Sequence, residues 1–304
     1  VNINKIATIR NARGGSNPNL LKMAKDIQSY GAQGITIHPR PDQRHITYKD
    51  AIDLPKIIST EFNIEGNPIE KFIELVCKIK PDQVTLVPDS VDAITSNSGW
   101  DTLKNKSFLE EVISEFKNNG IRTSVFVDTD LKLIEGAKTT GADRIELYTE
   151  SFAVNFQKGN KDEINKYINA SVLANDLGMG VNAGHDLSLE NIHFFVDKIP
   201  YLDEVSIGHA IICESLYLGI ENVVNMYLQK INNAFIPIVS FLDVVIFWDP
   251  FYTLGIYDNV LRMDDGTALT NANGTNKTTK IPIVVVWLVL GAIFFTVRMK
   301  FINI

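Results

Sequence analysis

Titratable and cationic side chains follow a short apolar run near the start of this sequence. The run Gly34–Ile37 is followed closely by His38, Arg40 and His45, with Pro39 between the first two. Unpaired groups of this kind are expensive to bury, so they are poor material for a hydrophobic core. They are suited to a site that holds an anion and moves protons. The stretch therefore predicts an acid–base site at the end of a buried strand.

Polar and titratable groups recur at the ends of the other apolar runs. These groups are Asn2, Asn4 and Lys5, then Glu65, Thr95, Glu146 and His185, and finally Gly208 and His209. Histidine and desolvated glutamate can both exchange protons near neutral pH. If the runs are strands of one parallel barrel, their C-terminal ends meet at the mouth where such barrels carry catalysis.

The elements that must position these groups alternate regularly between strand and helix. Eight β-rich runs are predicted, at Val1–Asn4, Gly34–Ile37, Phe62–Glu65, Gln83–Val87, Arg122–Val127, Arg144–Leu147, Gly180–Ala183 and Glu204–Ile207. Helical segments between them include Leu20–Tyr30, Ile69–Ile79, Ser107–Asn118, Leu131–Thr139, Lys161–Leu177 and Ile211–Ile231. The alternation predicts the α/β class, as a (β/α)8 TIM barrel. An open doubly wound sheet is the alternative, but no Gly-rich dinucleotide fingerprint follows the first run.

Two features indicate phosphate binding. Arg13 and Arg40 carry fork-shaped guanidinium groups that suit phosphate oxygens. Gly208 and His209 open the helix after the last run, where barrels commonly bind phosphate on backbone N–H groups. A tight turn with a satisfied histidine is the other interpretation of that segment.

Other uses of these residues remain open at this stage. Lys5 could form a Schiff base, as in aldolase-like barrels, or it could contact phosphate. Histidine and glutamate side chains can also bind zinc, but no HExxH motif or short paired spacing supports a metal site. Asp89, like the other aspartates near strand ends, is interpreted as a solvated loop charge.

Composition narrows the class of protein. The 304 residues are 45% hydrophobic and 21% charged, as in ordinary globular proteins, and the net charge of −7 gives no sign of a nucleic-acid partner. Cys77 and Cys213 are far apart without metal-ligand spacing, which predicts free thiols in a reducing compartment. No basic-then-apolar leader opens the sequence, so a cytoplasmic location is expected for the barrel.

Seven sequence motifs carry a resemblance to a known family. They are VNINKIATIRNARGG, GITIHPRPDQRHI, FNIEG, QVTLVPD, RIELYTE, VNAGHD and EVSIGHAII. Together they resemble the pyridoxine 5′-phosphate synthase family of vitamin B6 biosynthesis, over residues 1–230 of the chain. The resemblance implies a TIM barrel with extra helices, assembled as an octamer. It also implies a transferase that joins 3-amino-2-oxopropyl phosphate to 1-deoxy-D-xylulose 5-phosphate, yielding pyridoxine 5′-phosphate, phosphate and water, with no metal or other cofactor.

The resemblance also implies roles for individual residues. His38 is the implied proton acceptor, Glu65 a second acid/base, His185 the proton donor and Glu146 a stabiliser of the transition state. The implied aminoketone phosphate site consists of Asn2, Arg13, Asp186, Gly208 and His209. The implied deoxyxylulose phosphate site consists of Asn4, Lys5, Arg40, His45 and Thr95. Many members have Asp-His in place of Asn4-Lys5 and Gly in place of Asp186, and these departures are expected to alter binding detail and not the reaction.

Residues 233–304 differ in character from residues 1–232, which are predicted to form the barrel domain. The segment 281–297 is uncharged and apolar, and its length of about 25 Å predicts a transmembrane helix that could bring the chain to a membrane. The stretch FWDPF…LGIYD…IPIVVVWLVLGAIFFTVRMKFINI resembles the N-terminus of sodium:alanine symporters, truncated after the first hydrophobic segments. A fusion or assembly artefact beside a working barrel is the leading interpretation. A membrane-tethered or transport-associated protein and a buried helix at an oligomer interface are the alternatives.

Overall fold

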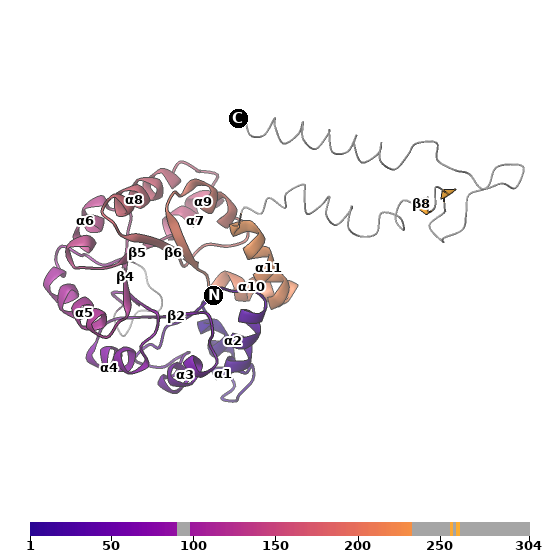
Figure 1. The fold of residues 1–304 in the computed structure, drawn as a ribbon, viewed down its shortest axis with the longest axis horizontal. Helices are drawn as coiled ribbons and strands as arrows, with labels where there is room; N and C mark the ends of the chain where they lie inside the picture. Colours follow the sequence, from indigo (N-terminus) through magenta and orange to yellow (C-terminus); the bar gives the residue numbers. More distant parts are fainter. Residues whose placement is uncertain (90–97, 233–255, 258–259, 262–304) are drawn as a thin grey trace, which may run out of the picture. The chain divides into compact units, whose positions relative to one another are not determined.

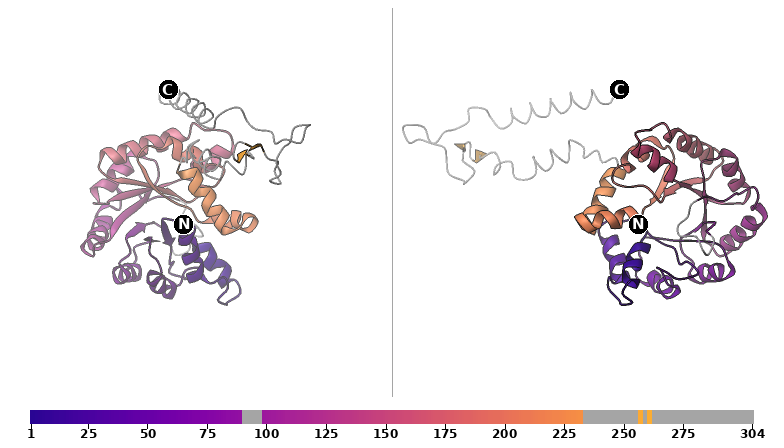
Figure 2. Two further views of the ribbon diagram at one scale, coloured as in Figure 1. Left: turned by 45° about the vertical axis from the view of Figure 1, so that its right-hand side comes forward. Right: turned by 180° about the vertical axis from the view of Figure 1, so that it is seen from behind.

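The computed structural model describes residues 1–89, 98–232, 256–257 and 260–261. The chain divides into two compact units, Val1–Ala234 and Phe235–Ile304. In the first unit, helices form a ring around a central set of strands (Figure 1). Figure 2 shows the same ring from two further directions. The predicted acid–base residues all belong to this unit.

A parallel sheet of seven strands forms the centre of the first unit, and each strand pairs with the next along the chain. The sheet curls into a nearly closed barrel (Figure 1). Because every pair is parallel, the C-terminal ends of the strands share one rim. The strands are β1 (Gly34–Ile37), β2 (Glu61–Gly66), β3 (Gln83–Leu86), β4 (Arg122–Val127), β5 (Arg144–Tyr148), β6 (Gly180–Gly184) and β7 (Leu202–Ser206).

The first predicted strand, Val1–Asn4, is wrong as a full strand. Asn2 forms a single β-bridge with Thr36, and a helix begins at Asn4. On the other side, the N–H of Asn2 donates to the C=O of Ile207, just beyond β7, at 2.9 Å. The start of the chain therefore links β1 to β7 without forming a regular eighth strand. The parallel barrel that the sequence predicts is present, and its described residues form seven strands instead of eight.

The helices pack around the outside of the barrel (Figures 1 and 2). They are α1 (Asn4–Asn11), α2 (Leu20–Ser29), α3 (Tyr48–Asp53), the 3₁₀ helix η1 (Leu54–Lys56), α4 (Glu70–Ile79), α5 (Lys106–Asn118), α6 (Leu131–Thr139), α7 (Glu150–Gln157), α8 (Ile164–Asp176), α9 (Ile192–Lys198), α10 (His209–Leu218) and α11 (Ile220–Ile231). The single helix predicted over residues 211–231 is two helices, because Gly219 adopts a φ of +80° that ends the first one.

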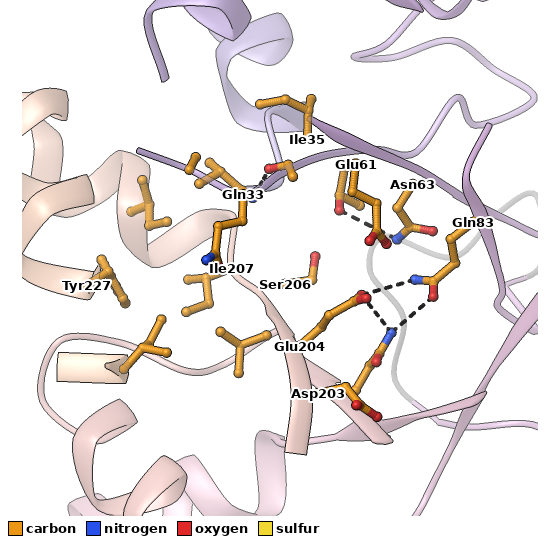
Figure 3. Close-up of a pocket in the computed structure, with 18 of the residues that line it drawn as sticks. Gln33, Ile35, Glu61, Asn63, Gln83, Asp203, Glu204, Ser206, Ile207 and Tyr227 are labelled. Carbon is orange, nitrogen blue, oxygen red and sulfur yellow. Dashed lines mark hydrogen bonds between the residues drawn. The ribbon is translucent and has the colours of Figure 1, made fainter. Parts of the chain in front are cut away.

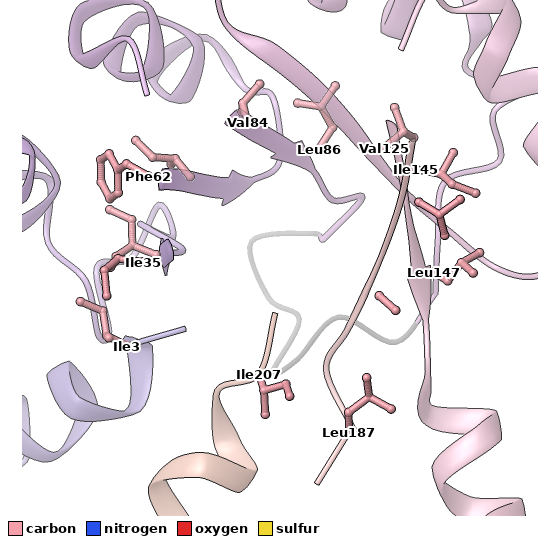
Figure 4. Close-up of a cluster of buried hydrophobic side chains, with 14 of the residues drawn as sticks. Ile3, Ile35, Phe62, Val84, Leu86, Val125, Ile145, Leu147, Leu187 and Ile207 are labelled. Atoms are coloured by element: carbon pink, nitrogen blue, oxygen red, sulfur yellow. The ribbon is translucent and has the colours of Figure 1, made fainter. Parts of the chain in front are cut away.

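Side chains alternate along the strands between the helix layer and the barrel interior. Buried apolar residues such as Val84, Leu86 and Val125 form the core between sheet and helices (Figure 4). The interior of the barrel is polar, and Gln83 on β3 donates to Glu204 on the distant strand β7 at 3.5 Å. Charged groups inside this barrel are therefore held away from bulk water but next to other polar groups.

The second unit is described at two short strands only. They are β8 (Ile256–Tyr257) and β9 (Val260–Leu261), which pair antiparallel. The transmembrane helix predicted at 281–297 lies outside the described residues. Within the part of the chain that is described, no helix combines the length and the apolar character needed to cross a membrane.

Candidate active site

Four predicted acid–base groups lie at the C-terminal rim of the barrel. His38 follows β1, Glu65 is near the end of β2, Glu146 is on β5, and His185 follows β6. His38, Glu65 and Glu146 are 7%, 5% and 2% exposed. The charge of His185 lowers the pKa of His38, and the charge of Glu146 raises the pKa of Glu65. The four side chains therefore lie near one another at the rim, with His185 half-buried and the other three buried.

Burial keeps the two histidines after β1 uncharged. It is the largest cause of the low pKa of His38, which lies well below the ordinary 6.5, and the charge of His45 acts in the same direction. Burial also lowers the pKa of His45 to about 4, helped by the positive charges of Arg40 and Lys5. The backbone N–H of Ile46 donates to His45 Nδ1 at 2.9 Å, so the proton of the neutral ring is on Nε2. His45 can thus donate to a ligand while His38 stays available as a base.

The same burial has the opposite effect on the carboxyl groups. It raises the pKa of Glu65 well above 4.5, and the neighbouring Glu146 raises it further. Burial, and then the charge of Glu204, raise the pKa of Glu146 to about 7. Asn2 donates to Glu65 Oε2 at 3.2 Å, and the Ser206 hydroxyl donates to Oε1 at 3.5 Å. Both carboxyl groups are consequently able to hold a proton near neutral pH.

His185 has an unusual backbone conformation, with a φ of +83°. Its ring centroid lies 5.5 Å from that of Phe126 and 5.8 Å from that of Tyr148. Burial lowers its pKa, and the adjacent Asp186 carboxylate partly opposes this effect. The protonation state of His185 is therefore set by two competing influences from residues within the same rim.

Arg40 is the most deeply buried cationic group of the site, at 3% exposure. It donates from Nη1 to Asp89 Oδ2 at 2.9 Å. The interpretation of Asp89 as a solvated loop charge is wrong, because this carboxylate is 9% exposed. A buried guanidinium requires a nearby negative charge, and Asp89 supplies it from the end of the β3 region.

The segment after β7 meets the start of the chain. His209 is the first residue of α10, as predicted for a helix N-terminus that could bind phosphate. A Cβ atom added to Gly208 would lie 3.0 Å from Cβ of Asn2, so glycine allows the close approach of the two segments. Burial raises the pKa of Asp186 and the charge of His209 opposes that rise, so both residues lie on the same side of the rim.

The residues at the start of the chain reach the site from a helix. Lys5 lies in the first turn of α1, so it reaches the site from a helix and not from the end of a strand. Its positive charge lowers the pKa of His45 and of His185, so it still faces the rim. Asn4 Oδ1 accepts the backbone N–H of His38 at 2.8 Å.

Two predicted residues are not brought into this cluster. Arg13 is exposed on the segment that follows α1. Thr95 lies outside the described residues. The remaining twelve predicted residues belong to the strand ends, to the loops that follow them, or to the start of α1 and α10.

The chain also has a cavity of about 270 Å³, which extends toward the opposite end of the barrel (Figure 3). Gln33, Glu61 and Gln83 line it from the beginnings of β1, β2 and β3. Glu146 and Ser206 border it from the barrel interior. Of the four acid–base side chains, only Glu146 lines this cavity, so the cavity adjoins the acid–base cluster without containing it.

Three hydroxyl groups at the site could not be found from the sequence, namely the fully buried Thr85 and Thr149 and the half-buried Ser206. The Ser206 hydroxyl donates to Glu65, and the Thr85 hydroxyl, which also opposes the raised pKa of Glu146, donates to Asn63 Oδ1 at 3.2 Å. The Thr149 hydroxyl donates to the C=O of Gly184 and accepts the N–H of Asp186. Serine and threonine are uncharged and common in strands, so they do not stand out in a sequence as titratable residues do. The only available signal was the two-residue period, which places Ser206 on the same face as Gly208.

The described residues include both cysteines and can be searched for clusters of metal-binding side chains. Cys77 and Cys213 are free thiols, as predicted. No group of three or more His, Cys, Asp or Glu side chains in the described part of the chain is arranged to hold a metal ion.

The fold and the rim together define an acid–base enzyme on a parallel barrel, with cationic groups placed to receive an anionic substrate. Residues 1–233 match the family described as "Pyridoxal phosphate biosynthesis protein PdxJ". The chain belongs to this family.

Relatives with high identity agree with the family match. A pyridoxine 5′-phosphate synthase of Flavobacterium johnsoniae is 67% identical over 231 residues, covering 76% of this chain and 98% of the relative. The synthase of Christiangramia forsetii is 63% identical over 229 residues, covering 75% and 97%. The synthase of Cytophaga hutchinsonii is 62% identical over 231 residues, covering 76% and 97%. The family match ends at residue 233, so the resemblance of the following segment to symporters is not supported.

Proposed function

We propose that this protein is a pyridoxine 5′-phosphate synthase. It condenses 3-amino-2-oxopropyl phosphate with 1-deoxy-D-xylulose 5-phosphate to give pyridoxine 5′-phosphate, inorganic phosphate and water. The observation that carries the proposal is the cluster at one rim of the barrel of the buried His38, Glu65 and Glu146 with the half-buried His185. The high identity to relatives that bear this name supports it.

The proposed reaction requires several proton transfers but no redox step. The amine of one substrate condenses with the ketone of the other, and dehydration, phosphate loss and ring closure follow. His38 acts as the first base, because its low pKa leaves the imidazole neutral at neutral pH. Glu65 is the second acid/base, and its raised pKa suits proton exchange near neutrality. Glu146 stabilises the developing positive charge of the transition state.

Two sets of residues are proposed to hold the two phosphorylated substrates. The aminoketone phosphate binds at the N-terminus of α10, where backbone N–H groups and the helix dipole favour an anion. Its residues are Asn2, Asp186, Gly208 and His209, together with Arg13, which the resemblance implies and which is exposed outside the cluster in the structure. The deoxyxylulose phosphate binds near the buried guanidinium of Arg40 and the Nε2–H of His45. Its residues are Asn4, Lys5, Arg40, His45 and Thr95.

Substrate binding itself changes the protonation of the rim. A phosphate dianion close to an imidazole favours the charged form, so it raises the pKa of the histidine. His185 has a lowered pKa in the empty site. Binding of the aminoketone phosphate beside Asp186 and His209 therefore converts His185 into the proton donor of the reaction.

Finer features of the protein are also proposals. The catalytic domain comprises residues 1–232, and it assembles as an octamer like the family that the sequence resembles. Residues 233–304 form a separate segment that the reaction does not use, with membrane contact through 281–297 as its one proposed interaction. Sedimentation of the full chain and of residues 1–232, with and without vesicles of neutral phospholipid, tests both features. A monomeric barrel would contradict the octamer, and equal vesicle binding by both chains would contradict a membrane role for the segment.

The activity is tested with the full chain and both phosphorylated substrates, following pyridoxine 5′-phosphate by its absorbance. His38→Ala is expected to lose about 10²- to 10⁴-fold in rate, the usual contribution of a general base. His193→Ala is the matched control, because this histidine is exposed on α9, away from the rim. Residues 1–232 are assayed beside the full chain, and equal rates are expected. A folded wild-type protein that makes no product would refute the proposed function.

A further inference from the structure

The side chain of Thr149 departs from the usual behaviour of its position. Thr149 directly follows β5, precedes the first residue of α7, and is fully buried. A threonine at the N-cap of a helix normally accepts a hydrogen bond from an N–H of the first turn. The hydroxyl of Thr149 makes no such bond. It is directed to the neighbouring strand end instead.

The hydroxyl of Thr149 connects the two peptide groups that flank His185. It donates to the C=O of Gly184, and it accepts the N–H of Asp186 at 3.2 Å. His185 lies between these groups with a φ of +83°. Residues other than glycine rarely adopt this region, and they persist there only where the surroundings hold them. One buried hydroxyl therefore restrains both ends of a strained residue.

Thr149 is itself held firmly in place. Its C=O accepts the N–H of Ala153 at 3.0 Å, and the preceding C=O, that of Tyr148, accepts the hydroxyl of Tyr167 at 2.8 Å. The backbone N–H of His185 itself donates to the C=O of Ser206, the last residue of β7, at 3.3 Å. The restraint on His185 thus comes from a rigid junction of β5, β6 and β7.

The backbone angle of His185 decides where its imidazole lies. At the observed φ, the ring packs against Phe126 and against the edge of Tyr148. A return to an ordinary negative φ would redirect the Cα–Cβ bond and move the ring away from these two aromatic side chains. Release of the flanking peptide groups is the simplest way to permit that change.

We propose that Thr149 is a positioning residue, which holds the His185 imidazole at the rim in the geometry required for proton transfer to the bound substrate. This inference rests on the proposed function, because it concerns the residue proposed there as the proton donor. A different role is that Thr149 only joins β5 to β6 and adds stability. The two roles differ in what they predict for His185.

Kinetics of matched variants separate the two roles. Thr149→Val keeps the shape and removes the hydroxyl, and Thr149→Ser keeps the hydroxyl. Thr140→Val is the control, because Thr140 is also buried and its hydroxyl donates to the C=O of Ala137 at 2.6 Å on α6. In the full chain we expect Thr149→Val to lower kcat by about 10²-fold with little change in KM, as for a misplaced catalytic group. Thr149→Ser and Thr140→Val are expected to keep kcat within about threefold.

A second readout is independent of the reaction. The pKa of His185 is measured by NMR titration of the ring C–H signals in the full chain, with His185→Asn used to assign the resonance. Burial lowers this pKa in the wild type. In Thr149→Val the ring leaves its aromatic surroundings, so its pKa is expected to rise toward 6.5, while Thr149→Ser keeps the wild-type value.

The outcomes distinguish this inference from the proposed function. If the wild type makes no product, the proposed function fails, and the inference fails with it as a statement about proton transfer. The titration then still decides whether Thr149 places the ring. If Thr149→Val unfolds at a lower temperature but keeps the wild-type kcat and the wild-type pKa of His185, the positioning role is refuted. Should Thr149→Val not fold, Thr149→Ala replaces it in both measurements.

Discussion

Replacement of Glu146 by glutamine should make the protein more stable and less active. Glu146 is 2% exposed on β5, and its Oε2 atom has no hydrogen-bond partner among the described residues. Burial and the nearby Glu204 raise its pKa from 4.5 to about 7, against a smaller opposing effect of the Thr85 hydroxyl. The folded state therefore holds the proton of Glu146 more tightly than the unfolded state does. Glutamine resembles the protonated form and cannot ionise.

The expected free energy follows from this pKa difference. One pKa unit corresponds to about 1.4 kcal/mol, so the rise from 4.5 to about 7 corresponds to about 3.5 kcal/mol. This contribution is fully present below pH 4.5 and is lost as the pH rises through 7. Wild-type protein should therefore lose about 2.5 kcal/mol between pH 5 and pH 8 through this one group, and Glu146→Gln should not. Glu65 acts in the same direction, because Glu146 also raises its pKa.

Urea-induced unfolding of the full chain at pH 5 and pH 8 measures the effect. The quantity of interest is the change with pH in the free-energy difference between Glu146→Gln and wild type. Glu111→Gln is the control, because Glu111 is an exposed carboxylate on α5. The kcat of Glu146→Gln should fall by about 10²-fold, since the charge that stabilises the transition state is gone. A stability difference that is the same at both pH values would refute the assigned cause of the raised pKa.

Two further aspartates give predictions of different kinds. Asp186→Asn should lower the pKa of His185, because the negative charge of Asp186 raises that pKa. The high-pH limb of the kcat profile should therefore move to lower pH. A limb that does not move would contradict the coupling between the two side chains. Asp89→Asn should cost about 3 kcal/mol in urea unfolding, because it leaves the Arg40 guanidinium buried without its carboxylate. The exposed Asp176→Asn on α8 is the control for both variants, and equal unfolding free energies for Asp89→Asn and Asp176→Asn would exclude the buried pair as the cause.

The strands of the barrel could be predicted because their signal is local. Arg122–Val127 and Gly34–Ile37 have the observed limits, since each is an apolar run bounded by polar or turn residues. The same reasoning predicted a strand at the start of the chain, at Val1–Asn4, and this prediction was wrong. Its alternation of apolar residues with asparagine is typical of a strand, yet Asn2 Oδ1 accepts the N–H of Asn4 at 3.0 Å and the chain turns into α1. A local side-chain hydrogen bond replaced the strand pairing that the pattern predicted.

The candidate site likewise contains residues that the sequence could predict and residues that it could not. His38, Glu65 and His185 could be recognised because titratable groups next to buried strands have few structural uses. Asp89 and Thr149 could not, because an aspartate in a loop and a threonine before a helix are ordinary in sequence. Their importance comes from partners distant along the chain, namely Arg40 for Asp89 and the two peptide groups around His185 for Thr149.

Burial is the largest cause of the shifted pKa values of all four acid–base groups at the rim. It disfavours charge of either sign, so it lowers the pKa of His38 and His185 and raises that of Glu65 and Glu146. An empty site at neutral pH therefore holds neutral histidines beside carboxyl groups that can exchange protons near that pH. In the proposed reaction, each phosphate dianion stabilises imidazolium and so supplies the charge that the empty rim disfavours. Acid catalysis by His185 is then coupled to occupancy of the phosphate sites, and the enzyme acquires its proton donor only when a substrate is present to use it.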